Sequence, residues 1–257
     1  MSINTEPKIS KSEDLERFIL KEKLQRYLKK YSKLVEEVRI MHKNSKALTC
    51  GAHDFSHVLM VGQYCIRLTE NEIVEELSWL AALLHNTDRL IWDNSRTKDE
   101  NENIVFCKVR DLLEDCVKDL LSKIPKKLIS EAVMEHSKLN SDQDSHVTMI
   151  LKDADRLANL GPNMVIRNGQ AYHDRQGYNL MHTRDFSPGS TYATAPTALD
   201  AIRYALEWEG MLRVPKAQSL AKPYLEILRK FIEGFSKQAE EVSLDDYPFP
   251  EDYGKLL

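Results

Sequence analysis

The chain has 257 residues, of which 42% are apolar and 30% are charged, and its formal net charge is −4. With only 9 glycines and 9 prolines, this composition excludes collagen-like and Gly/Pro-rich disordered classes and argues against a turn-dense β-sandwich. The small negative charge argues against a general nucleic-acid-binding protein.

Membrane insertion and secretion are not expected from the sequence. No apolar stretch approaches the roughly 20 residues that span a bilayer. The first residues, MSINTEPKISKSEDLERF, lack the apolar centre of a secretory signal. The cysteines have no C-x-x-C spacing, which favours free thiols in a reducing compartment: Cys50, Cys65, Cys107 and Cys116. We therefore expect a cytoplasmic protein without a membrane partner.

Apolar residues recur at steps of three and four along most of the chain, a spacing that is typical of helices. The pattern predicts helices over 11–46, 54–68, 72–91, 104–124, 125–136, 146–160, 197–212 and 217–239. A polar loop is expected at 93–103, and the irregular stretch 169–196 has the length of a binding loop. No convincing alternating run predicts strands.

These patterns predict an all-α, single-domain helical bundle. A helical extension is expected over 1–49, the main domain over 50–240, and an acidic, extended tail over 241–257. The extension holds nine Lys and Arg against three Glu between residues 21 and 46. Because these charges accompany an apolar stripe, a solvated helix face is favoured over a nucleic-acid surface.

Ionisable residues gather in four short segments that lie in or beside the apolar patterns, where such groups are rarely placed without a partner. The segments are His53-Asp54-x-x-His57, His85-Asn86-x-Asp88-Arg89, Glu135-His136 and Asp153-x-Asp155-Arg156. Imidazole and carboxylate groups from separate helices form a common metal cage. A bound metal lowers the pKa of its water from about 15.7 to about 7. Basic residues nearby suit phosphate oxygens. The pattern indicates metal-assisted hydrolysis of a phosphate ester.

The order His57 … His85-Asn86 … Asp153 resembles the H…HD…D pattern of the HD superfamily of metal-dependent phosphohydrolases. The resemblance extends, in order, to segments of the YedJ-type branch, and it covers roughly 50–235. These segments are AHDFSHVLMV, LAALLHNTDRL, EAVMEHS, KDADRLANLGPNMVIR and RYALEWEGMLRVPKAQSLAKPYLEILRKFIEGF. It implies a helical bundle of the HD-domain type and one divalent metal: Mn, Fe, Ni, Mg or Zn.

Position by position, the resemblance implies that His57, His85 and Asp153 are metal ligands. At the remaining ligand position, Asn86 stands where the family has Asp. Asn offers a neutral carbonyl oxygen, contributes no charge and cannot act as a base. We therefore expect a weak fourth ligand and reduced metal occupancy.

Three further residues are candidates for catalysis. Asp88, three residues after His85, could replace the missing carboxylate, or it could pair with Arg89 or Arg156 or cap a turn. His136 could contact phosphate or transfer a proton, or it could be a core histidine. Arg156 or Arg167, together with Lys152, is expected to neutralise the charge that develops on the phosphoryl oxygens. The candidates for substrate binding are Arg89, Lys152 and Arg167.

The resulting prediction is a phosphohydrolase in which a metal-activated water attacks a phosphomonoester or phosphodiester, with a nucleotide as the expected substrate. The alternative is a weakened HD module that binds a nucleotide or a protein partner, because Asn86 replaces the metal-binding Asp. A third, more distant hypothesis is a two-iron oxygenase that uses His53, Asp54 and His136 as additional ligands. The sequence leaves the metal, the substrate and the oligomeric state open.

Overall fold

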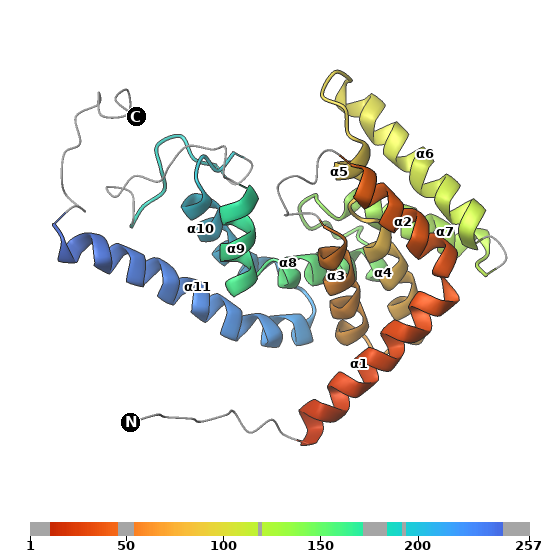
Figure 1. The fold of residues 1–257 in the computed structure, drawn as a ribbon, viewed down its shortest axis with the longest axis horizontal. Coiled ribbons are helices and arrows are strands. Elements are labelled where there is room, and N and C mark those ends of the chain that lie inside the picture. Colours follow the sequence, from red (N-terminus) through yellow and green to blue (C-terminus); the bar gives the residue numbers. More distant parts are fainter. Residues whose placement is uncertain (1–10, 46–53, 118–119, 172–183, 192–193, 244–257) are drawn as a thin grey trace. The chain divides into compact units, whose positions relative to one another are not determined.

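The computed structural model describes residues 11–45, 54–117, 120–171, 184–191 and 194–243. All regular elements among these residues are helical, which confirms the predicted all-α fold. Figure 1 shows their course. The elements are α1 (Lys11–Lys30), α2 (Ser32–Asn44), α3 (Phe55–Leu68), α4 (Glu72–Leu84), α5 (Thr87–Ile91), α6 (Lys98–Val117), α7 (Lys123–Glu135), α8 (His146–Ala158), α9 (Pro162–Ala171), α10 (Ala198–Glu207), the short 3-10 helix η3 (Trp208–Met211) and α11 (Pro215–Glu241).

Contacts divide the chain into two compact units, which are described separately. Unit 1 comprises Met1–Ser45 and Val58–Leu151, and unit 2 comprises Lys46–His57 and Lys152–Leu257. The expected segments 1–49, 50–240 and 241–257 stay a prediction. Cys50, His53, half of the loop 169–196 and nearly all of the tail lie outside the described residues.

Unit 1 is built around α4, which is the most apolar of the described helices. Its Leu80, Ala81 and Leu84 are fully buried, and α4 packs against α7. Asn71 caps the start of this helix, because its side chain accepts hydrogen bonds from the amides of Ile73 and Val74. The core of unit 1 therefore holds the end of α4, where His85 follows.

Two long predicted helices are each interrupted. The helix expected over 11–46 breaks at Tyr31, whose backbone has φ −112° and ψ 29°. The buried hydroxyl of Tyr31 donates to Glu76 at 2.8 Å, a tertiary contact that the helical pattern does not reveal. The helix expected over 72–91 breaks at His85 and Asn86, between α4 and α5. Both breaks fall at residues with buried polar groups.

Helix α6 begins six residues before its predicted start, inside the expected polar loop. Thr97 and Glu100 form a reciprocal cap: the Thr97 amide donates to Glu100 at 2.8 Å, and the Glu100 amide donates to the Thr97 hydroxyl at 3.3 Å. Helix α9 was not predicted, and it begins with Pro162 as its first residue. Local capping chemistry explains both starts.

Unit 2 contains α9, α10 and α11, and α10 packs against both of the others. Asp200 near the start of α10 binds the segment before it: its carboxylate accepts from the amide of Ser187 at 2.9 Å and from the hydroxyl of Thr197 at 2.7 Å. Phe186 stacks on Tyr204 with 4.2 Å between ring centroids. These contacts fix residues 186 and 187 on α10.

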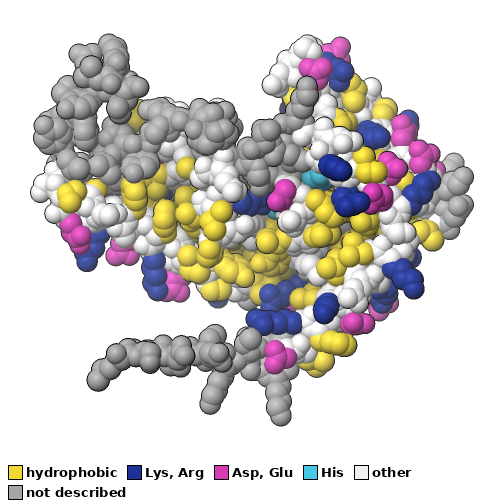
Figure 2. Space-filling view, viewed as in Figure 1, with side chains coloured by type: hydrophobic (Ala, Val, Ile, Leu, Met, Phe, Trp, Pro, Cys, Tyr) yellow, Lys and Arg dark blue, Asp and Glu magenta, His cyan; other side chains and the backbone are white. Residues whose placement is uncertain are grey.

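The charged surface of the described helices is mixed in sign. Figure 2 shows basic and acidic side chains together over α6, where Lys98 pairs with Glu102 and Arg110 with Asp111. Some of the basic residues of α1 and α2 also form ion pairs, including Lys23 with Glu75. Such mixing is typical of a solvated surface.

Two further sequence expectations are tested in part. None of the helices that the structure describes combines the length and apolar character needed to cross a bilayer. Three of the cysteines are free thiols, as predicted: Cys65 is buried, and Cys107 and Cys116 are half-buried.

Candidate functional site

The most direct pair of metal-ligand groups in unit 2 is His57 and Asp155. His57 lies in the first turn of α3, which Asp54 caps by accepting a hydrogen bond from the His57 amide at 2.8 Å. The imidazole is buried, with 3% of the residue exposed. Its Nε2 lies 3.1 Å from Oδ1 of Asp155 on α8. The Asp54 cap therefore fixes the backbone position from which the His57 imidazole extends.

Asp153, the carboxylate that the resemblance implies, points elsewhere. Residues two apart on a helix differ by about 200° in direction, so Asp153 and Asp155 occupy different faces of α8. Asp153 is fully buried, and its Oδ2 accepts from the amides of Arg213 and Val214, both at 2.8 Å. It therefore holds the residues that lead into α11.

The electrostatic surroundings of Asp153 fit this supporting role. Burial raises the pKa of Asp153, while the amides of Val214 and Arg213 and the Arg156 guanidinium act in the opposite direction. Arg156 Nη1 lies 3.4 Å from Asp153 Oδ1 and donates to the carbonyl of Met211 at 3.3 Å. Arg156 thus binds the end of η3, next to the Arg213 and Val214 amides that Asp153 binds.

Two other basic candidates of unit 2 are buried. Lys152 on α8 is 1% exposed, and the guanidinium of Arg167 on α9 contacts Nδ1 of His57. Since a guanidinium can only donate, Nδ1 accepts in this arrangement and the proton of a neutral ring is on Nε2, facing Asp155. Arg167 therefore sets the tautomer of His57.

The donor set of His57 and Asp155 fits a divalent metal. Two ligand atoms that each lie about 2.1 Å from one ion are roughly 3.0–3.4 Å apart at ordinary coordination angles, and the observed separation is 3.1 Å. Nitrogen and oxygen ligands suit Mn, Fe, Ni and Zn. An ion in place of the Nε2 proton requires a proton on Nδ1, so Arg167 would have to turn away from the ring.

In unit 1, His85 and His136 lie together. Their rings meet edge to face, with centroids 5.3 Å apart. In each ring Nδ1 lies 2.6 Å from a backbone carbonyl, that of Ala82 for His85 and that of Val133 for His136. A carbonyl at Nδ1 places the proton there and leaves Nε2 as the ligand or acceptor atom. His85 thus has the orientation of a metal ligand.

Asn86 is 2% exposed and lies between α4 and α5. Its side chain makes no capping hydrogen bond to α5. The other two candidates of this segment pair with each other: Asp88 Oδ1 accepts from the Arg89 amide at 2.7 Å, and Arg89 Nε lies 3.7 Å from Asp88 Oδ2. This is the structural alternative that the sequence left open for Asp88.

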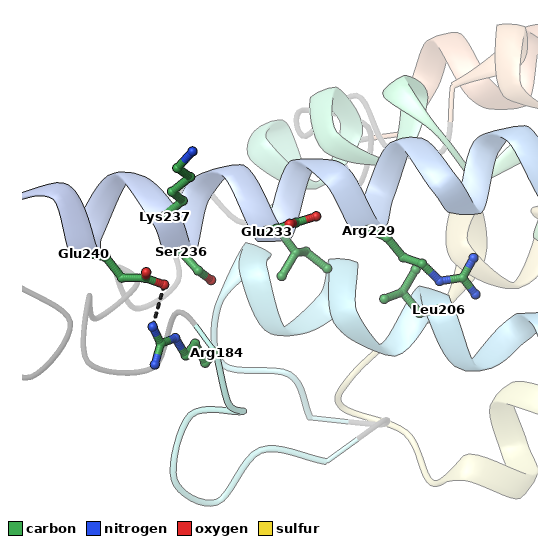
Figure 3. A pocket seen from close by; sticks show the side chains of 8 residues that line it. Arg184, Leu206, Arg229, Glu233, Ser236, Lys237 and Glu240 are labelled. Atoms are coloured by element: carbon green, nitrogen blue, oxygen red, sulfur yellow. Dashed lines mark ion pairs between the residues drawn. The ribbon is translucent and has the colours of Figure 1, made fainter.

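A separate groove of about 510 Å³ lies between α10 and α11 of unit 2. Figure 3 shows its lining, with Arg184 paired to Glu240; their atoms are 2.5 Å apart. Charges of both signs line the groove, and none of the lining residues is a histidine or a cysteine. The groove contains carboxylates but no imidazole, and Glu240 is paired with Arg184, so we do not treat it as a candidate metal centre.

The structure thus places Asp155 beside His57. The sequence analysis included Asp155 in the segment Asp153-x-Asp155-Arg156 but did not predict it as a ligand. A signal was present: the D-x-D spacing allows only one carboxylate to share a helix face with a given neighbour. The periodicity does not show which one, because apolar residues lie next to both aspartates in the sequence.

Comparisons with known proteins bear on the fold and on the family of one segment. Residues 54–160 match the HD domain family. No curated protein sequence matches the chain. Solved structures that are 16–20% identical to the chain share its fold.

In three of these structures, the part that matches this chain is nearly the whole of the solved chain. A Lactobacillus plantarum protein has a TM-score of 0.63 at 16% identity, over 83% of this chain and 97% of that one. An HD-superfamily hydrolase from Bacillus thuringiensis has a TM-score of 0.58 at 19% identity, over 83% and 98%. Bacillus subtilis YpgQ in complex with ADP has a TM-score of 0.51 at 20% identity, over 79% and 97%.

Proposed function

We propose that this protein is an HD-type, metal-dependent phosphohydrolase of the YedJ-type branch that acts on a small phosphorylated molecule. One observation carries the proposal: a buried imidazole nitrogen and a carboxylate oxygen from α3 and α8 lie 3.1 Å apart. Both belong to the segment 54–160 that matches the HD domain. HD-type proteins use such groups to hold a divalent ion.

We assign the carboxylate ligand to Asp155, because Asp153 already accepts two amide hydrogen bonds from the residues before α11. His85 and Asn86 complete the ligand set as the resemblance implies. The ion, one of Mn, Fe, Ni, Mg or Zn, supplies a hydroxide near neutral pH when it is bound. Reduced occupancy is expected, since Asn86 brings no charge.

The basic candidates act on the phosphate. Arg167 is the strongest of them, because an ion on His57 requires this guanidinium to turn away from the ring, and a phosphate oxygen is the partner that suits it. Lys152 and Arg156 add positive charge in unit 2, and Arg89 is proposed as a further substrate contact. His136 and Asp88 are proposed for proton transfer.

A nucleotide is the proposed substrate class. The support comes from YpgQ, a structure of the same fold that contains ADP. A diphosphate offers several anionic oxygens, which fits the number of basic candidates: Arg89, Lys152, Arg156 and Arg167.

The test is phosphate release from ADP, deoxynucleotides and a simple aryl phosphate, with the full chain loaded in turn with each candidate metal. We expect metal-dependent hydrolysis that falls at least about 100-fold in Asp155→Asn, because the lost carboxylate is a ligand. Asp111→Asn, at an exposed position on α6, is the matched control and should keep wild-type activity. Hydrolysis that is absent with every metal, or unchanged in Asp155→Asn, contradicts the proposal.

The second candidate is a binding module that has lost its chemistry, and Asn86 is the observation that favours it. Its signature in the same experiment is nucleotide binding without phosphate release. Binding is measured separately by calorimetry with ADP, so the two functions give different results.

A further inference from the structure

We propose that Asn159 is a positioning residue that orients the Asp155 carboxylate toward the divalent ion, an inference that rests on the proposed function. Asn159 directly follows α8, whose last residue is Ala158. It is four residues after Asp155, the spacing at which side chains on a helix meet.

The Asn159 side chain binds Asp155 at two points. Its Nδ2 donates to Asp155 Oδ1 at 3.0 Å and to the Asp155 backbone carbonyl at 3.0 Å. Both partners are acceptors, so the amide nitrogen must face them and the amide orientation is fixed by chemistry. One group therefore holds both the carboxylate and the backbone of the same residue.

The carboxylate is also held from a second direction. Oδ1 of Asp155 accepts from Asn159 Nδ2 and lies 3.1 Å from His57 Nε2. Two neighbours on one oxygen restrict rotation of the carboxylate about its last torsion. With an ion held by His57 and Asp155, the amide of Asn159 would still restrain the Asp155 carboxylate. Neighbours of this kind commonly change metal affinity by about 10–100-fold.

A purely structural role is the competing explanation, because Asn159 also ends the helix. Its backbone amide donates to the carbonyls of Asp155 at 3.2 Å and Arg156 at 3.1 Å. The chain offers a matched control in the same turn: Asn163 Nδ2 donates to the carbonyl of Ala158 at 2.6 Å, a bond to the backbone of α8 rather than to the carboxylate.

The experiment is a titration of the full-length protein with Co²⁺, read by calorimetry and by the visible absorption of the bound ion, which reports ligand geometry. The variants are Asn159→Ala, Asn159→Ser and Asn163→Ala. Serine is too short to reach the carboxylate, but its hydroxyl can still donate to the carbonyl four residues back. Asn159→Ser therefore keeps a side-chain bond to the Asp155 carbonyl and loses only the bond to the carboxylate, and it also serves as the second variant should Asn159→Ala not fold.

We expect both Asn159 variants to bind Co²⁺ about 10-fold or more weakly, with a changed absorption spectrum, while Asn163→Ala keeps the affinity and the spectrum of the wild type. Wild-type affinity and spectrum in the Asn159 variants overturn the positioning role and leave the proposed function standing. A wild-type protein that binds no Co²⁺ overturns the proposed function and this inference together.

Discussion

Asp153 and Asp155 show how two identical side chains in one helix take different tasks. The Asp153 carboxylate is enclosed and binds the amides of Arg213 and Val214. The Asp155 side chain keeps 24% of its surface exposed and faces His57. A metal ligand must be reached by ion and substrate, whereas a carboxylate that accepts two backbone amides supports the fold. Exposure and partners therefore separate the two roles.

Asn86 is the residue that limits the proposed metal centre, so Asn86→Asp should strengthen it. A carboxylate adds a negative charge and a harder oxygen ligand for the ion. We expect Mn²⁺ affinity to rise by at least about 10-fold, as measured by calorimetry on the full chain. An affinity that stays the same or falls would show that residue 86 is not a ligand.

The turn after α8 depends on a glycine. Gly161 has φ +69°, and a Cβ at this position would lie 2.9 Å from the ring of Tyr224 on α11. Gly161→Ala should lower the free energy of unfolding by about 1–3 kcal/mol, because both the backbone conformation and the contact are unfavourable for alanine. Chemical denaturation measures the change.

Gly169→Ala is the matched control for that substitution. Gly169 lies inside α9, and a Cβ there meets no atom within 4 Å. Alanine should leave stability unchanged or raise it by about 0.5–1 kcal/mol, since glycine is unfavourable within a helix. Equal destabilisation by both substitutions would show that the conformation of Gly161 has no special importance.

Asp200, which binds the start of α10 to Ser187, should make stability depend on acid pH. Burial acts to raise the pKa of Asp200, but the Ser187 and Thr197 hydrogen bonds and the charge of Arg203 outweigh it and hold the pKa below the usual 3.8. A lowered pKa in the folded state stabilises the fold above pH 3.8, and this contribution is lost as pH falls through the folded-state value.

We therefore expect Asp200→Asn to reduce the free energy of unfolding at pH 7 by about 1–3 kcal/mol. The variant should also lose less stability than the wild type as pH falls below 3.8. Denaturation curves at pH 3 to 7 test both points, and parallel pH profiles for the two proteins would contradict them.

The sequence predicted the presence of the helices more accurately than it predicted where they begin and end. Periodicity located α3, α7, α8 and α11 to within a few residues, because apolar spacing reflects the buried face directly. It missed the break at Tyr31, which depends on a hydrogen bond to a distant helix. It also missed the start of α6, although the Thr97–Glu100 cap was present in the sequence.

The candidate site was predictable to a similar degree. His57 and His85 stood out because histidines inside apolar helices need a partner, and the structure gives each ring one fixed nitrogen. The choice between Asp153 and Asp155 needed the fold, because it depends on where Arg213 and Val214 lie. The role of Asn159 could not be predicted from the sequence, since asparagine commonly occurs at the end of a helix for local reasons.

Across the whole chain, the segment 54–160 that matches the HD domain contains every proposed ligand: His57, His85, Asn86 and Asp155. His57 and Asp155 belong to unit 2, and the other two belong to unit 1. Metal binding should accordingly raise the temperature of unfolding, as any ligand that prefers the folded state does.

The most direct measurement is the metal content of the full-length protein, determined by elemental analysis after loading with Mn²⁺ and removal of unbound ion. Because Asn86 weakens the site, we expect partial occupancy, below one ion per chain, in the wild type and the same occupancy in the Asp111→Asn control. We expect nearly no metal in His57→Ala and Asp155→Asn. A wild type without metal, or His57 and Asp155 variants that retain as much metal as the wild type, would contradict this account.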